Sequence, residues 1–189
     1  MAMSSSFFQA ALLAGQSALS ANLVYRARLF ARAAHGAIGQ VRTGSSEPYI
    51  THPQAVAGIL ALIEADEVLQ AAGWLHDVVD DTGVGLEDIA TEFGSEVASL
   101  VWEVSESADG SGKSTRRHRK ALARERLSQA SSRAQTLKLA DILHNTAALD
   151  NLPPTFAALY LEEKKQEVAV LNRGDTNLLE LVRDQLQMA

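Results

Sequence analysis

The chain contains no cysteine and no apolar run long enough to span a bilayer, and its acidic residues outnumber its basic ones. The absence of cysteine excludes disulfides, cysteine-ligated zinc and thiol nucleophiles, and it is compatible with a cytoplasmic location. Because no stretch of about 20 apolar residues exists, no transmembrane helix is expected. The net charge of −6 argues against general binding to nucleic acid or to anionic membranes. An anionic substrate therefore needs a local cationic patch or a metal ion.

Strand-like alternation is also missing, and apolar residues recur at helical spacing through most of the chain. The hydrophobic content of 47% in 189 residues is enough for one well-filled domain. We expect an all-α domain over residues 22–189, a single helical bundle of roughly eight to ten helices. Residues 1–21 are expected to form an N-terminal extension or a leading helix. The expected helices cover approximately residues 23–35, 51–65, 66–81, 86–93, 95–104, 115–130, 131–149, 153–172 and 175–188.

A histidine and three carboxylates follow an apolar run between Trp74 and Thr82. In a continuous helix, His76 would lie above Asp80 and Asp77 above Asp81, because residues four apart share a face. Two carboxylates about 5 Å apart repel each other by roughly 3 kcal/mol at an effective dielectric of about 20. A divalent cation removes this cost, and imidazole beside carboxylates suits Mn²⁺, Fe²⁺ or Zn²⁺. The stretch therefore predicts half of a metal site.

Two further segments offer the other half of such a site. Lys138, Asp141 and Asn145 share one face of a later predicted helix, and His52 lies at the start of an earlier one. Two imidazoles and two carboxylates leave open positions on an octahedral ion for water and substrate. The four predicted metal ligands are His52, His76, Asp77 and Asp141.

Three motifs then occur in a fixed order: Glu-Pro-Tyr-Ile-Thr-His-Pro at 47–53, His-Asp-Val-Val-Asp-Asp-Thr at 76–82, and Lys-Leu-Ala-Asp at 138–141. Together they resemble the HD-domain hydrolases of the RelA/SpoT type over residues 22–170. The small stand-alone alarmone hydrolases, which include the metazoan SpoT homologues, are the most similar group. The resemblance implies Mn²⁺-dependent removal of the 3′-pyrophosphate from (p)ppGpp or (p)ppApp. Long members carry a nucleotide-synthesising domain after this one, and the length here leads us to expect hydrolysis alone.

The resemblance also implies a role for each matching residue. The four predicted ligands would hold the metal, and the acidic pair Asp80 and Asp81 would orient the attacking water and handle protons. Arg42 would contact phosphate, and Asn145 would contact the nucleotide. The expected partner is a small nucleotide, and no binding to nucleic acid or to a membrane is expected. The preference between guanosine and adenosine alarmones stays open, as does the oligomeric state.

The sequence departs from the family pattern at several positions. Asp80 stands where the family usually has glutamate, and Thr43 stands where a lysine is common after Arg42. Ala147 and Ala148 replace larger polar residues, and the loop from residue 35 to residue 40 is longer than usual. Two alternatives therefore stay open: an HD phosphohydrolase for another nucleotide, such as a 5′-nucleotidase or phosphodiesterase, or a catalytically weak alarmone-binding module.

Other conspicuous residues are interpreted more conservatively. Trp74 and Trp102 lie at apolar helical spacing and are predicted to be core residues. The basic run at 113–120 is interpreted as a solvated helix face. The remaining histidines have no matching partners and are interpreted as structural or surface residues: His35, His118 and His144.

Overall fold

The computed structural model describes residues 22–106, 115–147, 149 and 152–188. The prediction for residues 1–21 and the substitution at Ala148 lie outside these ranges. Within the described part there is no β-strand, only an isolated bridge between Val41 and Pro48, so the predicted all-α fold is confirmed. The helices are α2 (Leu23–Ala37), α3 (Thr51–Leu62), α4 (Glu67–Leu75), α5 (Val78–Asp81), α6 (Leu86–Phe93), α7 (Ser95–Val104), α8 (Arg116–Gln129), α9 (Ser132–Thr146), α10 (Pro154–Val168) and α11 (Thr176–Met188).

Five of the ten described helices start at a capping side chain that the sequence places just before them. The Asp66 carboxylate accepts a hydrogen bond from the Leu69 amide at 3.0 Å and begins α4. The Ser131 hydroxyl caps α9 in the same way, and Asp175 accepts from Leu178 at 2.9 Å at the start of α11. Such caps satisfy amides that otherwise lack a partner in the first turn.

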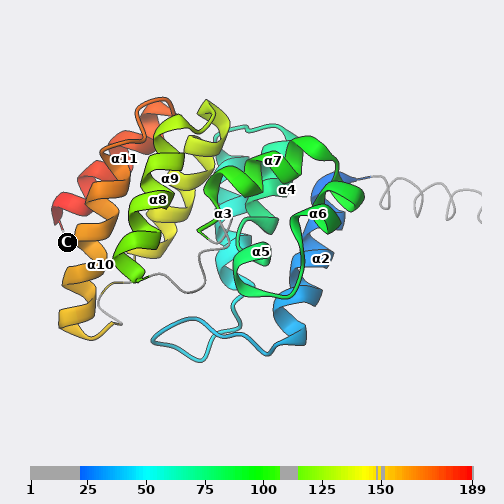
Figure 1. The fold of residues 1–189 in the computed structure, drawn as a ribbon, viewed down its shortest axis with the longest axis horizontal. Helices are drawn as coiled ribbons and strands as arrows, with labels where there is room; N and C mark the ends of the chain where they lie inside the picture. The colour runs from blue at the N-terminus through cyan, green and yellow to red at the C-terminus, as the bar shows by residue number, and fades with distance from the viewer. Residues whose placement is uncertain (1–21, 107–114, 148, 150–151, 189) are drawn as a thin grey trace, which may run out of the picture.

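The helices pack in two groups on either side of α9. Figure 1 shows α10 and α11 on one side, and α2 and α6 on the far side of α3 and α4. Helix α9 contacts α3, α4 and α7 in one direction and α10 and α11 in the other. Helix α9 is therefore covered from both directions, and most of its residues are buried. Among the described helices, none is long and apolar enough to cross a membrane.

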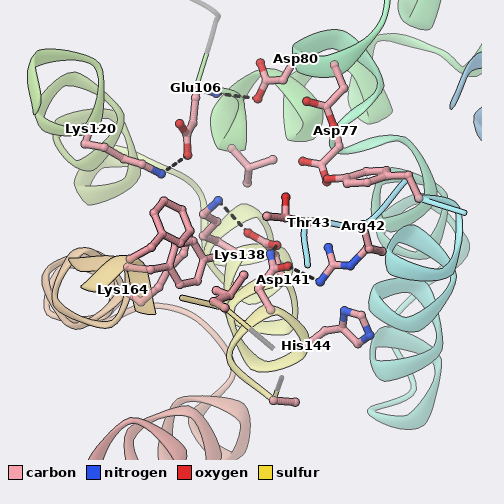
Figure 2. Close-up of a pocket in the computed structure, with 18 of the residues that line it drawn as sticks. Arg42, Thr43, Asp77, Asp80, Glu106, Lys120, Lys138, Asp141, His144 and Lys164 are labelled. Atoms are coloured by element: carbon pink, nitrogen blue, oxygen red, sulfur yellow. Dashed lines mark hydrogen bonds and ion pairs between the residues drawn. The ribbon is translucent and has the colours of Figure 1, made fainter. Parts of the chain in front are cut away.

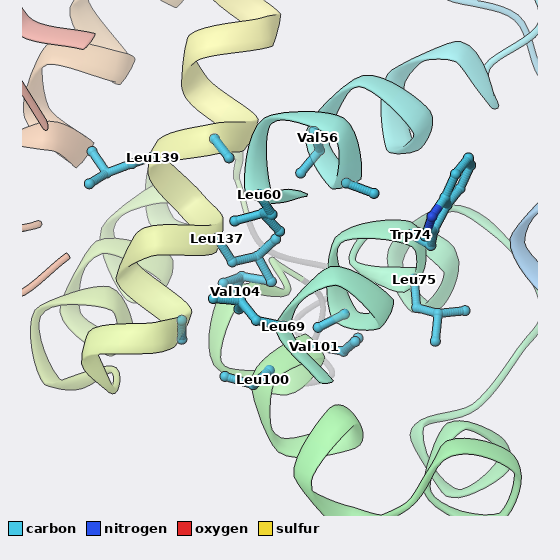
Figure 3. Close-up of a cluster of buried hydrophobic side chains, with 14 of the residues drawn as sticks. Val56, Leu60, Leu69, Trp74, Leu75, Leu100, Val101, Val104, Leu137 and Leu139 are labelled. Carbon is cyan, nitrogen blue, oxygen red and sulfur yellow. The ribbon is translucent and has the colours of Figure 1, made fainter. Parts of the chain in front are cut away.

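The core lies where α3, α4, α7 and α9 meet (Figure 3). Leu60, Leu75, Val101 and Leu137 come from these four helices and are fully buried. Full burial of one such side chain contributes about 1.5–3 kcal/mol relative to leaving it exposed. This packing holds the three segments that carry the predicted metal ligands in fixed relative positions.

The two tryptophans differ in environment. Trp74 is buried, as predicted, but the core prediction for Trp102 is wrong, because its side chain is 42% exposed. Val101 and Val104 lie on the face of α7 that packs against the core. Trp102, the residue after Val101, lies on the outer face of the helix. There the Arg126 guanidinium lies 5.5 Å from the Trp102 ring centroid.

The helix expected over residues 66–81 is interrupted. Helix α4 ends at Leu75, α5 begins at Val78, and His76 and Asp77 form the turn between them. The prediction that His76 and Asp80 share one continuous helix face is therefore wrong. The turn lets the two adjacent side chains His76 and Asp77 point toward one centre, which neighbours on a regular helix do not do.

Candidate metal centre

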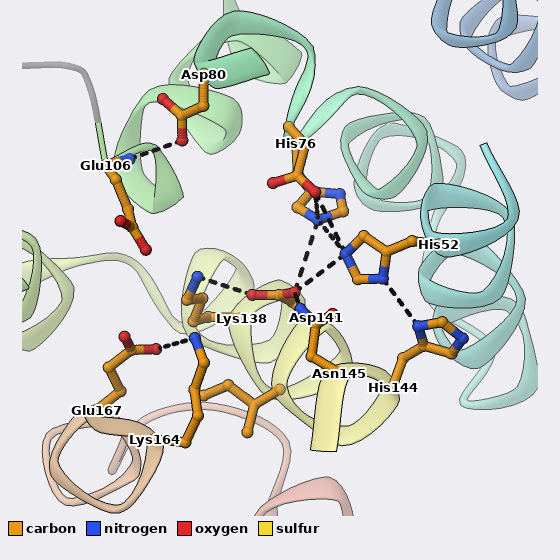
Figure 4. Close-up of polar contacts among 12 residues, drawn as sticks. His52, His76, Asp80, Glu106, Lys138, Asp141, His144, Asn145, Lys164 and Glu167 are labelled. Carbon is orange, nitrogen blue, oxygen red and sulfur yellow. Dashed lines mark hydrogen bonds and ion pairs between the residues drawn. The ribbon is translucent and has the colours of Figure 1, made fainter. Parts of the chain in front are cut away.

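The structure brings the four predicted ligands together, and Figure 4 labels three of them: His52, His76 and Asp141. His52 comes from the first turn of α3, His76 and Asp77 from the turn after α4, and Asp141 from α9. The two Nε2 atoms lie 3.2 Å apart, and Nε2 of His52 lies 3.2 Å from Oδ1 of Asp141. Nε2 of His76 lies 3.1 Å from Oδ2 of Asp77. Ligands at right angles on an ion with bonds of about 2.1 Å are about 3 Å apart, so these spacings suit a divalent transition metal.

The electrostatics of this cluster also fit a cation. Burial raises the pKa of Asp141, but the Lys138 ammonium together with the contacts to His52 and His76 outweighs it and holds the pKa well below its usual range. For Asp77, burial is likewise outweighed by the combined charge and hydrogen bonds of His76 and His52. Burial lowers the pKa of His76, yet Asp77 raises it to about 9. Two ionised carboxylates thus require a positive charge between them, which a proton on His76 or a divalent ion provides.

Both carboxylates are also held from outside the cluster. The Tyr49 hydroxyl donates to Oδ2 of Asp77 at 2.6 Å, and the Lys138 ammonium donates to Oδ2 of Asp141 at 2.8 Å. Burial, followed by the charges of Asp77 and Asp81, raises the pKa of Tyr49, so the phenol keeps its proton and acts as a donor. Tyr49 was not predicted as a site residue. Its position one turn before His52 is the sequence signal that points to it.

The histidine ligands differ in what holds their second ring nitrogen. Nδ1 of His76 lies 2.8 Å from the main-chain oxygen of Gly73. Nδ1 of His52 lies 2.8 Å from Nδ1 of His144, a half-buried residue on α9. No motif points to a partner for His144, although its position three residues after Asp141 places it one turn away on the same helix.

The two acids of the predicted catalytic pair point in different directions. Asp81 accepts a hydrogen bond from Nε2 of Gln40 at 2.8 Å. Desolvation in the cavity and then the charge of Asp77 raise its pKa, although the side chain keeps contact with solvent. Asp80 instead accepts from the Ser105 hydroxyl and, at 2.8 Å, from the Glu106 amide. Figure 4 shows the Asp80 carboxylate directed toward Glu106 at the end of α7.

The two predicted substrate contacts are joined to each other and to the metal ligands. Nη2 of Arg42 donates to Oδ1 of Asn145 at 2.9 Å, and Nδ2 of Asn145 donates to Oδ1 of Asp141 at 2.5 Å. The Arg42 guanidinium also lies 5.8 Å from the Tyr49 ring centroid. A loop residue and a residue of α9, far apart in the chain, therefore meet beside the metal ligands.

A cavity of about 560 Å³ opens next to this cluster, large enough for a nucleotide (Figure 2). Both acids and both substrate contacts line it, together with aromatic residues of α10. The solvated-face interpretation of the basic run is wrong for Lys120, which is buried and paired with Glu106 and Glu167. The basic residues that line the cavity are Arg42, Arg116, Arg119, Lys120, Lys138 and Lys164.

Comparison with known proteins points to one family. The model of the family described as HD domain matches residues 27–169. A Synechocystis protein named probable guanosine-3′,5′-bis(diphosphate) 3′-pyrophosphohydrolase is 42% identical over 151 residues, which cover 79% of this chain and 20% of that protein. A Haemophilus influenzae protein named guanosine-3′,5′-bis(diphosphate) 3′-pyrophosphohydrolase is 40% identical over 129 residues. The match covers 67% of this chain and 18% of that protein. The chain thus spans about a fifth of the length of these curated relatives.

Solved structures show the same fold. One, described as a metazoan orthologue of SpoT that hydrolyses ppGpp, superposes with a TM-score of 0.78 at 28% identity. The match covers 88% of this chain and 94% of that one. A Listeria monocytogenes protein superposes with a TM-score of 0.63 at 25% identity, covering 75% of this chain and 95% of that one.

Proposed function

Because the chain belongs to the HD domain family, we propose that it is a metal-dependent hydrolase that removes the 3′-pyrophosphate from (p)ppGpp or (p)ppApp and releases pyrophosphate. The observation that carries this proposal is the convergence of the His52 and His76 Nε2 atoms with the Asp77 and Asp141 carboxylates beside one cation-lined cavity. The names of the relatives in Synechocystis and Haemophilus, and of the metazoan structure, support the same substrate class.

His52, His76, Asp77 and Asp141 would hold the metal, which we propose is Mn²⁺. When bound, such an ion stabilises the charge of the phosphate and lowers the pKa of water toward neutrality. A three-residue buried group, His52, His76 and Asp141, has candidate ligand atoms within 4.8 Å of one another, which supports this assignment. Oδ2 of Asp77, at 3.3 Å from Nε2 of His52, supplies the fourth ligand.

Asp81 is our choice for the carboxylate that accepts the proton of the attacking water. Its raised pKa makes it a stronger base than an ordinary aspartate, and its exposed side chain can reach water in the cavity. Asp80, whose carboxylate accepts hydrogen bonds from the Ser105 hydroxyl and the Glu106 amide, would support the same step. Because the Asp80 carboxylate is hydrogen-bonded to Ser105 and Glu106, just after α7, we assign the main role to Asp81.

Arg42 and Asn145 would bind the substrate next to the metal ligands. The Arg42 guanidinium can offer two parallel donors to a phosphate, and Asn145 can turn its amide from Arg42 toward a nucleotide. The basic residues of α8, α9 and α10 that line the same cavity would cancel the remaining phosphate charge. An acidic protein with a net charge of −6 thereby gathers six basic residues around one cavity, beside an equal number of carboxylates that include the predicted metal ligands Asp77 and Asp141.

Release of pyrophosphate from ppGpp and ppApp, measured side by side with Mn²⁺ and with chelator, tests the proposal. We expect release with Mn²⁺ and none with chelator, and the ratio of the two rates reports base preference. The same assay includes deoxynucleoside monophosphates and cyclic nucleotides. Turnover of those compounds without pyrophosphate release from either alarmone would contradict the proposal. It would instead indicate an HD phosphohydrolase that acts on another nucleotide.

Replacing Asp81 tests the assignment of the base. We expect Asp81→Asn to lower the turnover number by about 10²–10⁴, since the amide cannot accept a proton, and to leave Mn²⁺ and nucleotide binding in place. Asp184→Asn, an exposed change on α11, is the matched control and should behave as wild type. A wild-type protein that binds alarmone but never turns it over would instead favour a binding module.

A further inference from the structure

We infer that His144 is a positioning residue that orients His52 toward the metal. The inference deepens the proposed metal site and rests on it. His52 is fully buried, and its Nε2 lies within 3.3 Å of the other three predicted ligands. Its remaining ring nitrogen, Nδ1, lies 2.8 Å from Nδ1 of His144. The two rings are 5.0 Å apart between centroids and tilted by 32°.

This contact allows only one arrangement of hydrogens once Nε2 of His52 binds a metal. A neutral imidazole has one N–H donor and one acceptor lone pair. For Nε2 of His52 to bind a metal, its hydrogen must be on Nδ1. Nδ1 of His52 then donates to Nδ1 of His144, and His144 must carry its own hydrogen on Nε2. With His144 protonated on Nε2, the hydrogen bond between the two rings therefore stabilises the metal-binding tautomer of His52 and holds its ring in place.

The corresponding contact of His76 uses the backbone instead. Its Nδ1 faces the Gly73 carbonyl oxygen, which can only accept a hydrogen bond. The tautomer of His76 is thus set by the turn after α4 and does not depend on any side chain. The tautomer and ring direction of His52 depend on a side chain that substitution can remove. Since α9 carries both Asp141 and His144, one helix supplies a ligand and orients a second ligand on α3.

Mn²⁺ titration of the full chain, followed by calorimetry or by loss of the free-ion electron paramagnetic resonance signal, tests the inference. We expect His144→Ala to weaken Mn²⁺ binding about 10–100-fold, the usual effect of losing such a partner. His144→Asn provides a carbonyl oxygen that can accept from Nδ1 of His52 and should restore most of the affinity. His118→Ala, an exposed histidine outside the cavity, should bind Mn²⁺ as wild type does.

A spectroscopic measurement on the wild type keeps the test independent of how the variants fold. In the Zn²⁺-loaded protein, long-range ¹H–¹⁵N spectra should show His52 with a protonated Nδ1 and a metal-bound Nε2. Metal binding through Nδ1 of His52, or a folded His144→Ala protein with wild-type affinity, would overturn this inference alone. A wild-type protein that binds no Mn²⁺ would overturn the proposed metal site as well.

Discussion

At the level of single residues, Gln40 connects the interior of the protein to the acid we propose as the base. Nδ1 of the buried His35 lies 2.7 Å from Oε1 of Gln40, and Nε2 of Gln40 donates to Asp81 at 2.8 Å. His35, which was interpreted as structural or surface, is thus a buried residue that fixes the amide orientation. The contact limits the directions in which the Asp81 carboxylate can point.

We expect Gln40→Ala to lower the turnover number about tenfold, or about 1.4 kcal/mol of barrier, with a smaller effect on KM. The hydrogen bond from Gln40 lowers the pKa of Asp81, so its loss raises that pKa. The acid limb of the rate–pH profile should therefore move to higher pH. Gln54→Ala on the exposed face of α3 is the control. An unchanged profile in Gln40→Ala would contradict this role.

At the level of elements, the segment between α10 and α11 docks closely on α9. The Arg173 amide donates to the Gln135 side chain at 2.7 Å, and the Asp175 amide donates to the Thr136 hydroxyl at 2.9 Å. Between them, a Cβ on Gly174 would lie 2.7 Å from Cδ1 of Leu139 and 3.1 Å from the main-chain carbon of Gln135. The glycine is required because the two backbones approach too closely for a side chain.

Two glycine-to-alanine changes should therefore shift the free energy of unfolding in opposite directions. Gly174→Ala should reduce the free energy of unfolding by about 1–3 kcal/mol through overpacking against α9. Gly58→Ala, where an added Cβ meets nothing within 4 Å on the exposed face of α3, should raise it by about 0.5–1 kcal/mol. Urea unfolding of both variants measures this difference. Equal effects of the two changes would argue against the close approach.

At the level of the whole molecule, a buried ionic network joins α8 and α10 behind the cavity. Lys164 and Glu167 are both 2% exposed and lie 2.8 Å apart, and Lys120 reaches Glu167 at 3.4 Å. Burial raises the pKa of Glu167, but attraction to Lys164, Lys138 and Lys120 outweighs it and lowers the pKa to about 2. Glu167 therefore keeps the cavity wall from carrying an excess of buried positive charge.

Glu167→Gln should lower the free energy of unfolding at pH 7 by about 3–5 kcal/mol, because it leaves buried ammonium groups without their partner. A carboxyl whose pKa falls on folding stabilises above its unfolded value of 4.5 and loses that contribution as the pH falls toward 2. The lowering of the Glu167 pKa from 4.5 to about 2 corresponds to roughly 3 kcal/mol of folding free energy. The stability difference between wild type and variant should therefore shrink between pH 4.5 and 2.

Chemical or thermal unfolding at several pH values measures this difference. Glu180→Gln, an exposed carboxylate on α11, is the control and should show little change at any of these pH values. A constant difference between wild type and Glu167→Gln across the acid range would contradict the pKa lowering that we assign to the network.

Local pattern was sufficient for most of the helices and for naming the four residues that meet in one cluster. Helical periodicity and capping residues such as Asp66 and Asp175 act over a few residues, so they predicted most element boundaries correctly. The four ligands lie in recognisable motifs, and the structure brings them together, while their binding of Mn²⁺ stays a prediction. These features depend on residue type and on near neighbours in the chain.

Other features depend on which helix faces meet. The burial of Lys120, the separate directions of Asp80 and Asp81, and the contact of His144 with His52 could not be read from spacing. Each arises because segments far apart in the chain pack against one another, as α9 does against α3 and α10. Periodicity reports that a helix has an apolar face, but it contains no information about which distant helix will cover that face.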